Sequence, residues 1–234
     1  MAKTITANDF TARTSAPAVN NKYYVSIKKN GYNRAAMCNA KTGSTLPNCT
    51  GASHGRWLEC AKNTDYKACD KLCTGDAKSY YGKNDGYKRG KEARVGAIAC
   101  WKGGTYGHLG FVEKVNSDGS IYCSMSDGEH NTRWYYRTIK KNNGSYSYND
   151  FTFLGFIYNP YVLEKIGTAK INQSASGLRI RKSASTKSTI VGHATIGKSY
   201  PVYEIKQNQG YTWYRIATDK WVANNGKWIT YKEV

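Results

Sequence analysis

A predicted β-hairpin in the middle of the chain constrains the fold most. Residues 108–125 contain two apolar runs around an Asn-Ser-Asp-Gly segment, which is typical of a turn between antiparallel strands. A four-residue loop pairs positions that sum to 235 and places His108 opposite Asp127, with Cβ atoms about 5 Å apart. A two-residue loop instead places Glu129 opposite His108, on the same face. Either carboxylate is then in a position to orient the imidazole ring.

A cysteine lies at the start of the other element that the sequence predicts. Asn48 fits a helix N-cap, and the residues up to Ala61 predict a helix of roughly four turns with Cys49 in its first turn. Unpaired N–H groups at a helix start lower the pKa of a thiol and bind an oxyanion. Because a thiol attacks an amide only as the thiolate, Cys49 and His108 form a candidate nucleophile and base.

A set of short motifs surrounds these two residues. They are Asn48-Cys49-Thr50-Gly51, Gly55-Arg56, Val95-Gly96-Ala97-Ile98-Ala99-Cys100-Trp101, Gly107-His108 and Phe153-Leu154-Gly155-Phe156-Ile157-Tyr158. Together they resemble the CHAP family of cysteine, histidine-dependent amidohydrolases and peptidases, which is common in bacteriophage endolysins and bacterial cell-wall hydrolases. The resemblance implies Cys49 as nucleophile, His108 as base and Asp127 as the residue that orients the base, with Glu129 as the alternative. The family often has Glu where Met125 stands, and a polar group where Asp127 stands.

A second set of motifs lies near the end of the chain. It comprises Ser176-Gly177-Leu178-Arg179-Ile180-Arg181, Ile190-Val191-Gly192, Tyr200-Pro201-Val202, Gly210-Tyr211-Thr212-Trp213-Tyr214-Arg215-Ile216 and Lys220-Trp221-Val222-Ala223. These motifs resemble bacterial SH3-like domains, which bind peptidoglycan peptides. The two resemblances imply an α+β fold class: a papain-like CHAP domain with a helix packed on an antiparallel sheet over 1–160, a linker over 161–172, and a small all-β SH3-like barrel over 173–234.

Aromatic residues are the candidate substrate-binding side chains. Trp101 in the first domain and Tyr203, Trp213 and Trp221 in the second are the expected contacts, because an amphipathic aromatic groove suits a wall peptide. The alternation along the last strands does not decide which rings face inward. The aromatic residues that divide between barrel core and barrel surface also include Tyr200, Tyr211, Tyr214 and Trp228.

The CHAP resemblance implies a peptidoglycan hydrolase that acts by acyl transfer, either an N-acetylmuramoyl-L-alanine amidase or an endopeptidase. An inactive wall-binding protein is the alternative, because Met125 stands where an acid is often found. No cofactor is expected. Residues 39–46 contain no carboxylate, so a calcium loop is not expected before Cys49. Cys60, Cys69 and Cys73 leave a zinc site open, although their spacing lacks a second matched pair.

The net charge of +19 indicates an anionic partner. The basic residues are dispersed and no recognition helix or RNP motif occurs, so peptidoglycan with teichoic acid is favoured over a specific nucleic acid. No run approaches the roughly twenty apolar residues of a membrane helix, so membrane insertion is not expected. The start of the chain lacks the pattern of a signal peptide. Together with these features, the CHAP resemblance implies a phage endolysin that is made in the host cytoplasm and released by a holin, and a monomer is expected.

Overall fold

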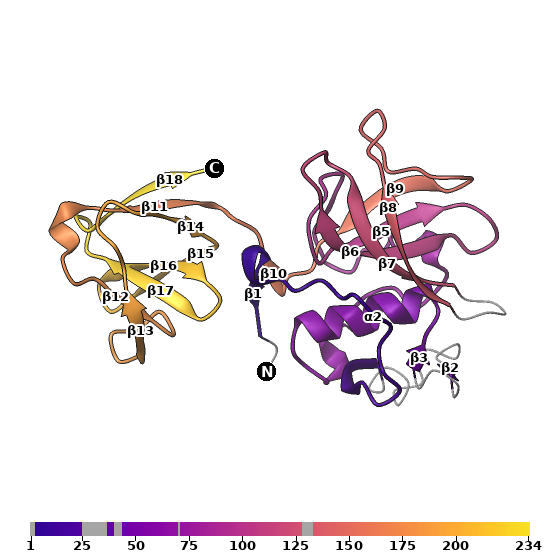
Figure 1. Ribbon diagram of the computed structural model, residues 1–234, viewed down its shortest axis with the longest axis horizontal. Coiled ribbons are helices and arrows are strands. Elements are labelled where there is room, and N and C mark those ends of the chain that lie inside the picture. The colour runs from indigo at the N-terminus through magenta and orange to yellow at the C-terminus, as the bar shows by residue number, and fades with distance from the viewer. Residues whose placement is uncertain (1–2, 25–36, 40–43, 70, 128–132) are drawn as a thin grey trace. The chain divides into compact units, whose positions relative to one another are not determined.

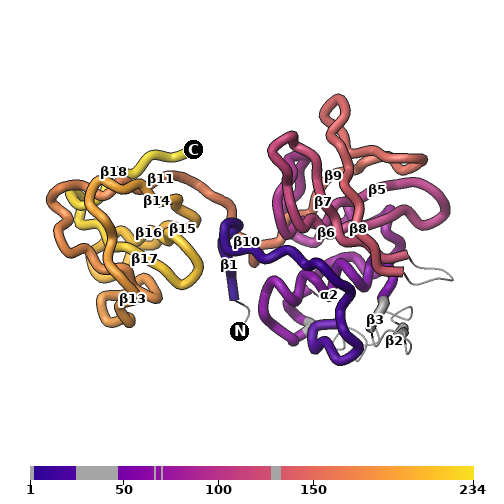
Figure 2. Tube along the Cα trace, viewed as in Figure 1, coloured from indigo at the N-terminus to yellow at the C-terminus, as the bar shows by residue number. Residues whose placement is uncertain are grey.

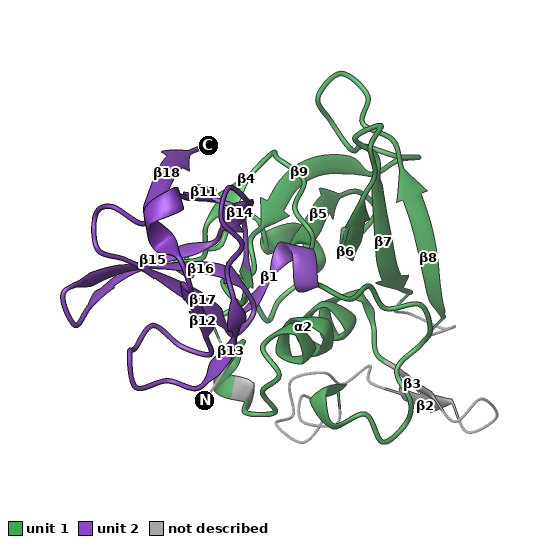
Figure 3. Cartoon of the chain, turned by 60° about the vertical axis from the view of Figure 1, so that its left-hand side comes forward, with its two compact units in different colours: residues 1–3, 10–162 green, residues 4–9, 163–234 purple. Residues whose placement is uncertain are grey.

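The chain folds into two compact units, which Figure 3 shows in different colours. Unit 1 comprises residues 1–3 and 10–162, and unit 2 comprises residues 4–9 and 163–234. The computed structural model describes residues 3–24, 37–39, 44–69, 71–127 and 133–234. Within those ranges, no helix is long and apolar enough to cross a membrane.

Unit 1 is built on a six-stranded antiparallel sheet with the strand order β4-β9-β5-β6-β7-β8. Helix α2 (Cys49–Cys60) packs against β6 and β7, and it lies beside these strands in both Figure 1 and Figure 2. The strands are β4 (Arg89–Gly90), β5 (Ile98–Lys102), β6 (His108–Val115), β7 (Ile121–Ser126), β8 (Trp134–Ile139) and β9 (Thr152–Ile157). The predicted α+β fold, with a helix on an antiparallel sheet, is confirmed.

Smaller elements complete the described part of unit 1. The strands β2 (Met37–Asn39) and β3 (Ser44–Leu46) pair with each other just before α2. Short 3-10 helices lie at Tyr66–Ala68 and Ala77–Ser79. The backbone N–H of Lys78, in the second of these, donates to the carbonyl of Tyr106, two residues before β6 begins. This contact ties the second 3-10 helix to the segment that leads into β6.

The hairpin of β6 and β7 has the predicted register near His108 but not at its turn. Phe111 pairs with Ser124 and Val112 pairs with Cys123, so these positions sum to 235 as predicted. An irregularity between Val112 and Lys114 shifts the rest of the hairpin by one residue, and Val115 pairs with Ile121. The predicted closing pair is therefore wrong, and a bulge restores the predicted register toward the start of β6.

The sheet of unit 1 also carries a buried hydrophobic cluster, which corrects one prediction. Trp101 was expected to bind substrate, but its side chain is fully buried and its indole N–H donates to the carbonyl of Tyr146 over 2.7 Å. Phe153 and Tyr148 pack against the Trp101 ring. A ring enclosed in this way presents no face to a ligand, so Trp101 belongs to the core.

Unit 2 contains two antiparallel sheets, with the strand orders β14-β11-β18 and β13-β12-β17-β16-β15. Its strands are β11 (Gly167–Ile171), β12 (Arg179–Arg181), β13 (Ile190–His193), β14 (Ser199–Val202), β15 (Glu204–Asn208), β16 (Tyr211–Ala217), β17 (Lys220–Asn224) and β18 (Ile229–Glu233). A 3-10 helix lies at Gln173–Ala175, and β10 (Val162–Leu163) precedes β11. This unit is all-β as predicted, and the SH3-like assignment stays a prediction.

Two boundaries of unit 2 differ from those predicted. The segment 161–172 was expected to be a linker, but it contains β11, which pairs with both β14 and β18. Residues 4–9, which hold β1 (Ile5–Thr6) and a 3-10 helix (Ala7–Asp9), also belong to this unit. Arg215 donates from Nη1 to Thr4 Oγ1 over 2.6 Å, and the Thr218 N–H donates to Asp9 Oδ2 over 2.7 Å. Such long-range pairing is not visible in a local sequence pattern.

Candidate active site

The start of α2 places Cys49 in the position that the sequence predicted. Asn48 has an extended backbone (φ −66°, ψ 177°), and its Oδ1 accepts hydrogen bonds from the Gly51 N–H at 2.9 Å and from Thr50 Oγ1 at 2.8 Å. Asn48 is therefore the N-cap, and Cys49 is the first helical residue. The N-cap prediction is confirmed.

A side-chain contact joins this helix start to the end of β7. Ser126 Oγ donates to the carbonyl of Pro47, the residue before the N-cap, and both residues are buried. Since α2 also packs along β6 and β7, the contact holds the helix start near the end of the hairpin. Cys49 is thereby brought to the strand that carries His108.

Burial raises the pKa of the Cys49 thiol to about 11. Hydrogen bonds from the backbone N–H groups of Leu109 and Thr50 act in the opposite direction, and the negative charge of Asp127 raises the pKa further. The side chain is half-buried and its sulfur is not in a disulfide. Cys49 is therefore a thiol at neutral pH, and it needs a base to become a nucleophile.

His108 is a buried base at the first position of β6. Its ring stacks on Tyr135, with an interplanar angle of 13°, and packs against Phe151. Burial lowers the pKa of His108 to about 4, against the effect of the Asp127 charge, and the charge of Arg137 lowers it further. The imidazole is therefore neutral at pH 7, which is the form that accepts a proton.

Asp127 lies directly after β7 and near both reactive groups. Its charge acts on the Cys49 thiol and on the His108 imidazole. Its carboxylate is 3.4 Å from the guanidinium of exposed Arg133. After burial, the charge of Asp127 and a hydrogen bond with it are among the causes that raise the pKa of Tyr135. The structure therefore brings together Cys49, His108 and Asp127, and it adds Tyr135, which we refer to with them as the Cys49 cluster.

Other residues considered from the sequence do not enter this cluster. Glu129 and His130 lie outside the described residues. Met125 is buried, and its side chain packs so closely on Gly110 that a Cβ there would be 2.8 Å from the Met125 methyl. His54 is fully buried with Nε2 3.2 Å from the Tyr80 hydroxyl, and burial lowers its pKa to about 3. The position often held by an acid in CHAP proteins therefore carries an apolar side chain.

A second polar cluster, which the sequence did not reveal, lies along the same helix. The Arg56 cluster consists of Arg13, Arg56, Glu59 and Glu113. Glu113 accepts from Arg56 Nε at 2.9 Å and Nη2 at 2.8 Å, and from Ser124 Oγ at 2.8 Å. Arg56 Nη1 also donates to Glu59 Oε2 at 3.0 Å. The sequence shows Gly55-Arg56 only as part of a motif. The partner of Arg56 is Glu113, 57 positions away, and a charge pattern does not reveal a pair at that separation.

The three aromatic residues predicted to bind ligand in unit 2 are buried. Tyr203 is 4% exposed, Trp213 1% and Trp221 5%. Trp213 and Trp221 form a small hydrophobic cluster with Ala223, separate from the main core of unit 2 around Tyr214, Ile216 and Val222. Trp213 Nε1 donates to the carbonyl of Asn208 over 3.0 Å. Tyr203 and Trp221 are therefore core residues, and the prediction that they bind substrate is wrong. Trp213 contributes only an edge to a neighbouring groove.

That groove has a volume of about 470 Å³. Half-buried Tyr211 and Trp228 line it and stack on each other with an interplanar angle of 18°, and Arg179 and Arg181 supply positive charge. The groove is lined by Ser174, Ala175, Ser176, Gly177, Leu178, Arg179, Arg181, Thr186, Tyr211, Trp213, Ala223 and Trp228. The aromatic content of these strands indicated such a surface, but only the packing shows which rings form it.

The described residues contain no cluster of metal ligands for the zinc or calcium sites considered from the sequence. Among the residues described, no group of three or more His, Cys, Asp or Glu side chains is placed to hold a metal ion. Cys60, Cys69 and Cys73 are buried and not in disulfides, and burial raises the pKa of Cys60 to about 12. Residues 40–43 of the segment considered for calcium lie outside the described part.

Known proteins resemble parts of this chain. A segment of 69 residues is 44% identical to the Probable autolysin SsaALP of Staphylococcus aureus and covers 27% of this chain and 25% of that protein. Another alignment, 55% identical over 40 residues, covers 17% of this chain and 12% of the N-acetylmuramoyl-L-alanine amidase sle1 of Staphylococcus epidermidis. The matches thus span a quarter or less of these relatives. The crystal structure of Ly7917 is 18% identical, with a TM-score of 0.33 over 92% of this chain and 100% of that chain.

A family model matches the part of the chain that holds Cys49, His108 and Asp127. Residues 39–127 match the model of the CHAP domain, and the staphylococcal relatives are similar over shorter segments. The matched range begins before α2 and ends at Asp127, so it contains the predicted nucleophile, base and carboxylate. The chain therefore carries a CHAP domain over residues 39–127, with Cys49, His108 and Asp127 inside it.

Proposed function

We propose that this protein is a peptidoglycan hydrolase that cleaves an amide bond of the bacterial cell wall with Cys49 as nucleophile. The observation that carries the proposal is the meeting of a helix-start thiol with a neutral, buried imidazole and a carboxylate in one cluster. The CHAP domain and its similarity to an autolysin and an amidase supply the substrate class.

The chemistry begins with a proton transfer. His108 takes the proton of Cys49, and the thiolate attacks the amide carbon to form a tetrahedral intermediate. The backbone N–H groups of Cys49 and Thr50 lie at the start of α2 and point toward the Cys49 sulfur, so they are the candidate donors to the oxyanion. The protonated His108 then gives its proton to the leaving amine, and a thioester remains.

Water completes the cycle with the roles reversed. His108 removes a proton from the water molecule, and the hydroxide attacks the thioester carbon. The thiolate leaves and recovers its proton from His108, so that the acid product departs and the starting state returns. The amidase relative favours the bond between muramic acid and L-alanine, and a peptide bond of the stem or cross-bridge is the alternative.

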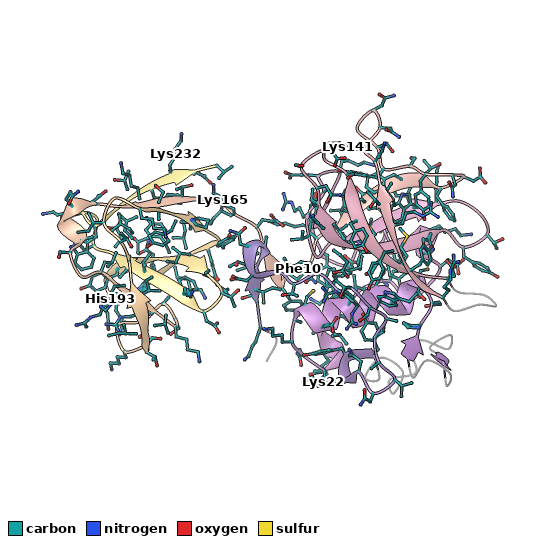
Figure 4. The ribbon with its side chains drawn as sticks, in the orientation of Figure 1. Phe10, Lys22, Lys141, Lys165, His193 and Lys232 are labelled. Carbon is teal, nitrogen blue, oxygen red and sulfur yellow. The ribbon has the colours of Figure 1, made fainter. Side chains whose placement is uncertain are left out.

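We propose further that unit 2 holds the enzyme on the wall, through the groove lined by Tyr211 and Trp228. Two features support this. The groove combines stacked aromatic rings with Arg179 and Arg181, which suits a peptide that carries carboxylates. Exposed lysines are spread over both units, as Lys22, Lys141, Lys165 and Lys232 illustrate in Figure 4, and suit anionic wall polymers such as teichoic acid.

The cellular setting that fits these proposals is host lysis by a phage. In this setting the protein is an endolysin made in the host cytoplasm, reaches the wall after holin-type release, and works as a monomer. A wall-binding protein without catalysis is the second candidate, and Met125 at the position often held by an acid is the observation that favours it.

The first test is the clearing of purified Gram-positive cell walls by the wild type and by Cys49→Ala, with mass spectrometry of the released fragments. Cys100→Ala is the matched control, because Cys100 is a buried thiol of the sheet. We expect clearing by the wild type and the control only, and the fragments name the bond. Equal clearing by Cys49→Ala contradicts the thiol mechanism. Wall binding without clearing by the wild type supports the second candidate.

A further inference from the structure

A tyrosine hydroxyl lies between the imidazole and the carboxylate of the Cys49 cluster. The Tyr135 hydroxyl is 3.2 Å from His108 Nε2. Burial raises the pKa of Tyr135, and the charge of Asp127 and a hydrogen bond with its carboxylate raise it further. Tyr135 belongs to β8, where it pairs with Met125 of β7, so it lies diagonally across from Asp127. One hydroxyl group therefore contacts both of the residues that the family resemblance pairs directly.

The direction of these two hydrogen bonds follows from the number of protons. A phenol has one proton to donate, and a carboxylate only accepts. The contact with Asp127 therefore uses the Tyr135 proton, and the hydroxyl oxygen is left to accept from His108. Nε2 then carries the imidazole proton, and Nδ1 carries the lone pair that receives the proton of a thiol.

We propose that Tyr135 is the positioning residue of His108, and that Asp127 acts on the imidazole through the Tyr135 hydroxyl. The inference rests on the proposed thiol mechanism. Met125, at the position often held by an acid, is buried and apolar, so the orienting contact comes from the neighbouring strand instead. The stacked ring of Tyr135 fixes the plane of the imidazole at the same time.

The ionisation of Tyr135 is consistent with this role. Burial raises the pKa of Tyr135, and the negative charge of Asp127 raises it further. The phenol therefore keeps its proton throughout the neutral range. A hydroxyl that stays protonated maintains the same pair of hydrogen bonds while His108 takes up and releases a proton.

The test compares Tyr135→Phe with Tyr136→Phe. The first variant keeps the stacked ring and removes the hydroxyl, and the second removes a hydroxyl from the next residue of β8. Two rates are measured: wall clearing, and alkylation of Cys49 by iodoacetamide between pH 5 and pH 9, which needs no wall. We expect both rates at neutral pH to fall about 10-fold to 100-fold in Tyr135→Phe, as for the loss of a charge-assisted hydrogen bond, and to change less than about twofold in Tyr136→Phe.

A double-variant cycle separates positioning from a general structural role. Asp127→Asn is expected to slow alkylation in the wild-type background and to have little further effect in Tyr135→Phe, because the two residues act in one chain. Fully additive effects, or a Tyr135→Phe variant that matches Tyr136→Phe, overturn the proposal. Melting curves of each variant identify any loss of folding, and alkylation rates are then referred to the folded fraction.

The two proposals fail in different ways. If wall clearing depends on Cys49 but Tyr135→Phe behaves like the control in both assays, only the role of Tyr135 is wrong. If Tyr135→Phe slows alkylation of Cys49 while the wild type clears no wall, the proposed hydrolase function is wrong and the positioning role stands.

Discussion

Two polar clusters lie along the same helix and the same pair of strands, and they differ in how their charges are paired. In the Arg56 cluster, each oxygen of the buried Glu113 carboxylate accepts two hydrogen bonds, and two guanidinium groups balance two carboxylates. In the Cys49 cluster, burial instead favours the neutral forms of Cys49 and His108. The first arrangement compensates its charges with one another, whereas the second contains a neutral thiol and a neutral imidazole that are both affected by the charge of Asp127.

This difference shows how the surroundings of a carboxylate indicate its role. Glu113 lies within β6, and Asp127 follows β7 directly. Only Asp127 is partly exposed, and its charge acts on the thiol and the imidazole. A carboxylate fully engaged by arginine supports packing, because its charge is already compensated. Shifted ionisation in a partly open cluster is typical of a catalytic site. Variants of both clusters test this distinction.

The largest expected effect is the loss of catalysis on removing the base. His108→Gln should lower the rate of wall clearing by about 10²-fold to 10⁴-fold, because the thiol loses its proton acceptor. The free energy of unfolding should change by less than about 1.5 kcal/mol, since no ion pair is broken. Clearing assays and urea unfolding measure the two quantities. If His108→Gln strongly lowers the free energy of unfolding while the folded fraction keeps its clearing activity, His108 stabilises the fold, as the Arg56 cluster does, and is not the base.

Arg56→Met should have the reverse profile. Removing the guanidinium leaves Glu113 buried without its main partner, and the free energy of unfolding should fall by about 3–5 kcal/mol. The matched variant Arg56→Met/Glu113→Leu removes both charges and should recover a large part of that loss. Urea unfolding of both variants is the measurement. Equal stability of the single and double variants contradicts the assignment of a compensated ion pair.

Acid should weaken the fold through two buried histidines. Burial lowers the pKa of His108 to about 4 and of His54 to about 3, below the value of about 6.5 for an exposed histidine. Between about pH 6.5 and pH 4 the unfolded chain therefore binds more protons, and the free energy of unfolding falls as pH falls, by up to about 1.4 kcal/mol per pH unit for each histidine.

Urea unfolding at pH 5 and pH 7 measures this dependence, and His54→Gln is the variant that isolates one contribution. The slope between the two pH values should be about half as steep in His54→Gln. Catalysis should retain its neutral base down to about pH 5, because the pKa of His108 is about 4. An unchanged slope in His54→Gln would contradict the buried, neutral state of that ring.

The smallest expected effect concerns the helix start. Asn48→Ala removes the N-cap acceptor of the Gly51 N–H and should lower the free energy of unfolding by about 1 kcal/mol. Asn48→Ser keeps an N-cap oxygen and is the control. Chemical unfolding gives the stability, and iodoacetamide alkylation reports whether Cys49 remains reactive. Equal losses in the two variants would show that Asn48 stabilises the fold through contacts other than the cap.

Much of the catalytic cluster was predictable because local rules govern its parts. Asn48 and Cys49 follow the pattern of a capped helix, and the cap is present. The turn of the β6–β7 hairpin uses Gly119 with φ 78°, as an Asp-Gly turn requires, and the N–H of Ser120 donates to Asp118 Oδ1 over 2.9 Å. The position of His108 relative to Asp127 agrees with the predicted hairpin only because a bulge offsets the error in the predicted turn.

Other parts were not predictable, because they depend on contacts between distant segments. The bulge between Val112 and Lys114 cancels the error in the predicted turn, and no local pattern announces it. Successive residues along the aromatic strands of unit 2 point to opposite faces, and this alternation is compatible with either face being the buried one. Packing placed Tyr214 and Val222 in the main core of unit 2, and it placed Trp213 and Trp221 in a second cluster against which Tyr211 and Trp228 of the groove pack.

The sequence by itself determined the capped helix with its thiol, the hairpin with its histidine, and the all-β character of the C-terminal region. These features depend on backbone preferences and on periodicity, which neighbouring residues set. Only the tertiary structure decided that the Tyr135 hydroxyl lies between His108 and Asp127, that Arg56 neutralises Glu113, and that residues 4–9 join unit 2. Such contacts arise when strands and termini far apart in the chain pack together, and their energies depend on burial that no single segment can specify.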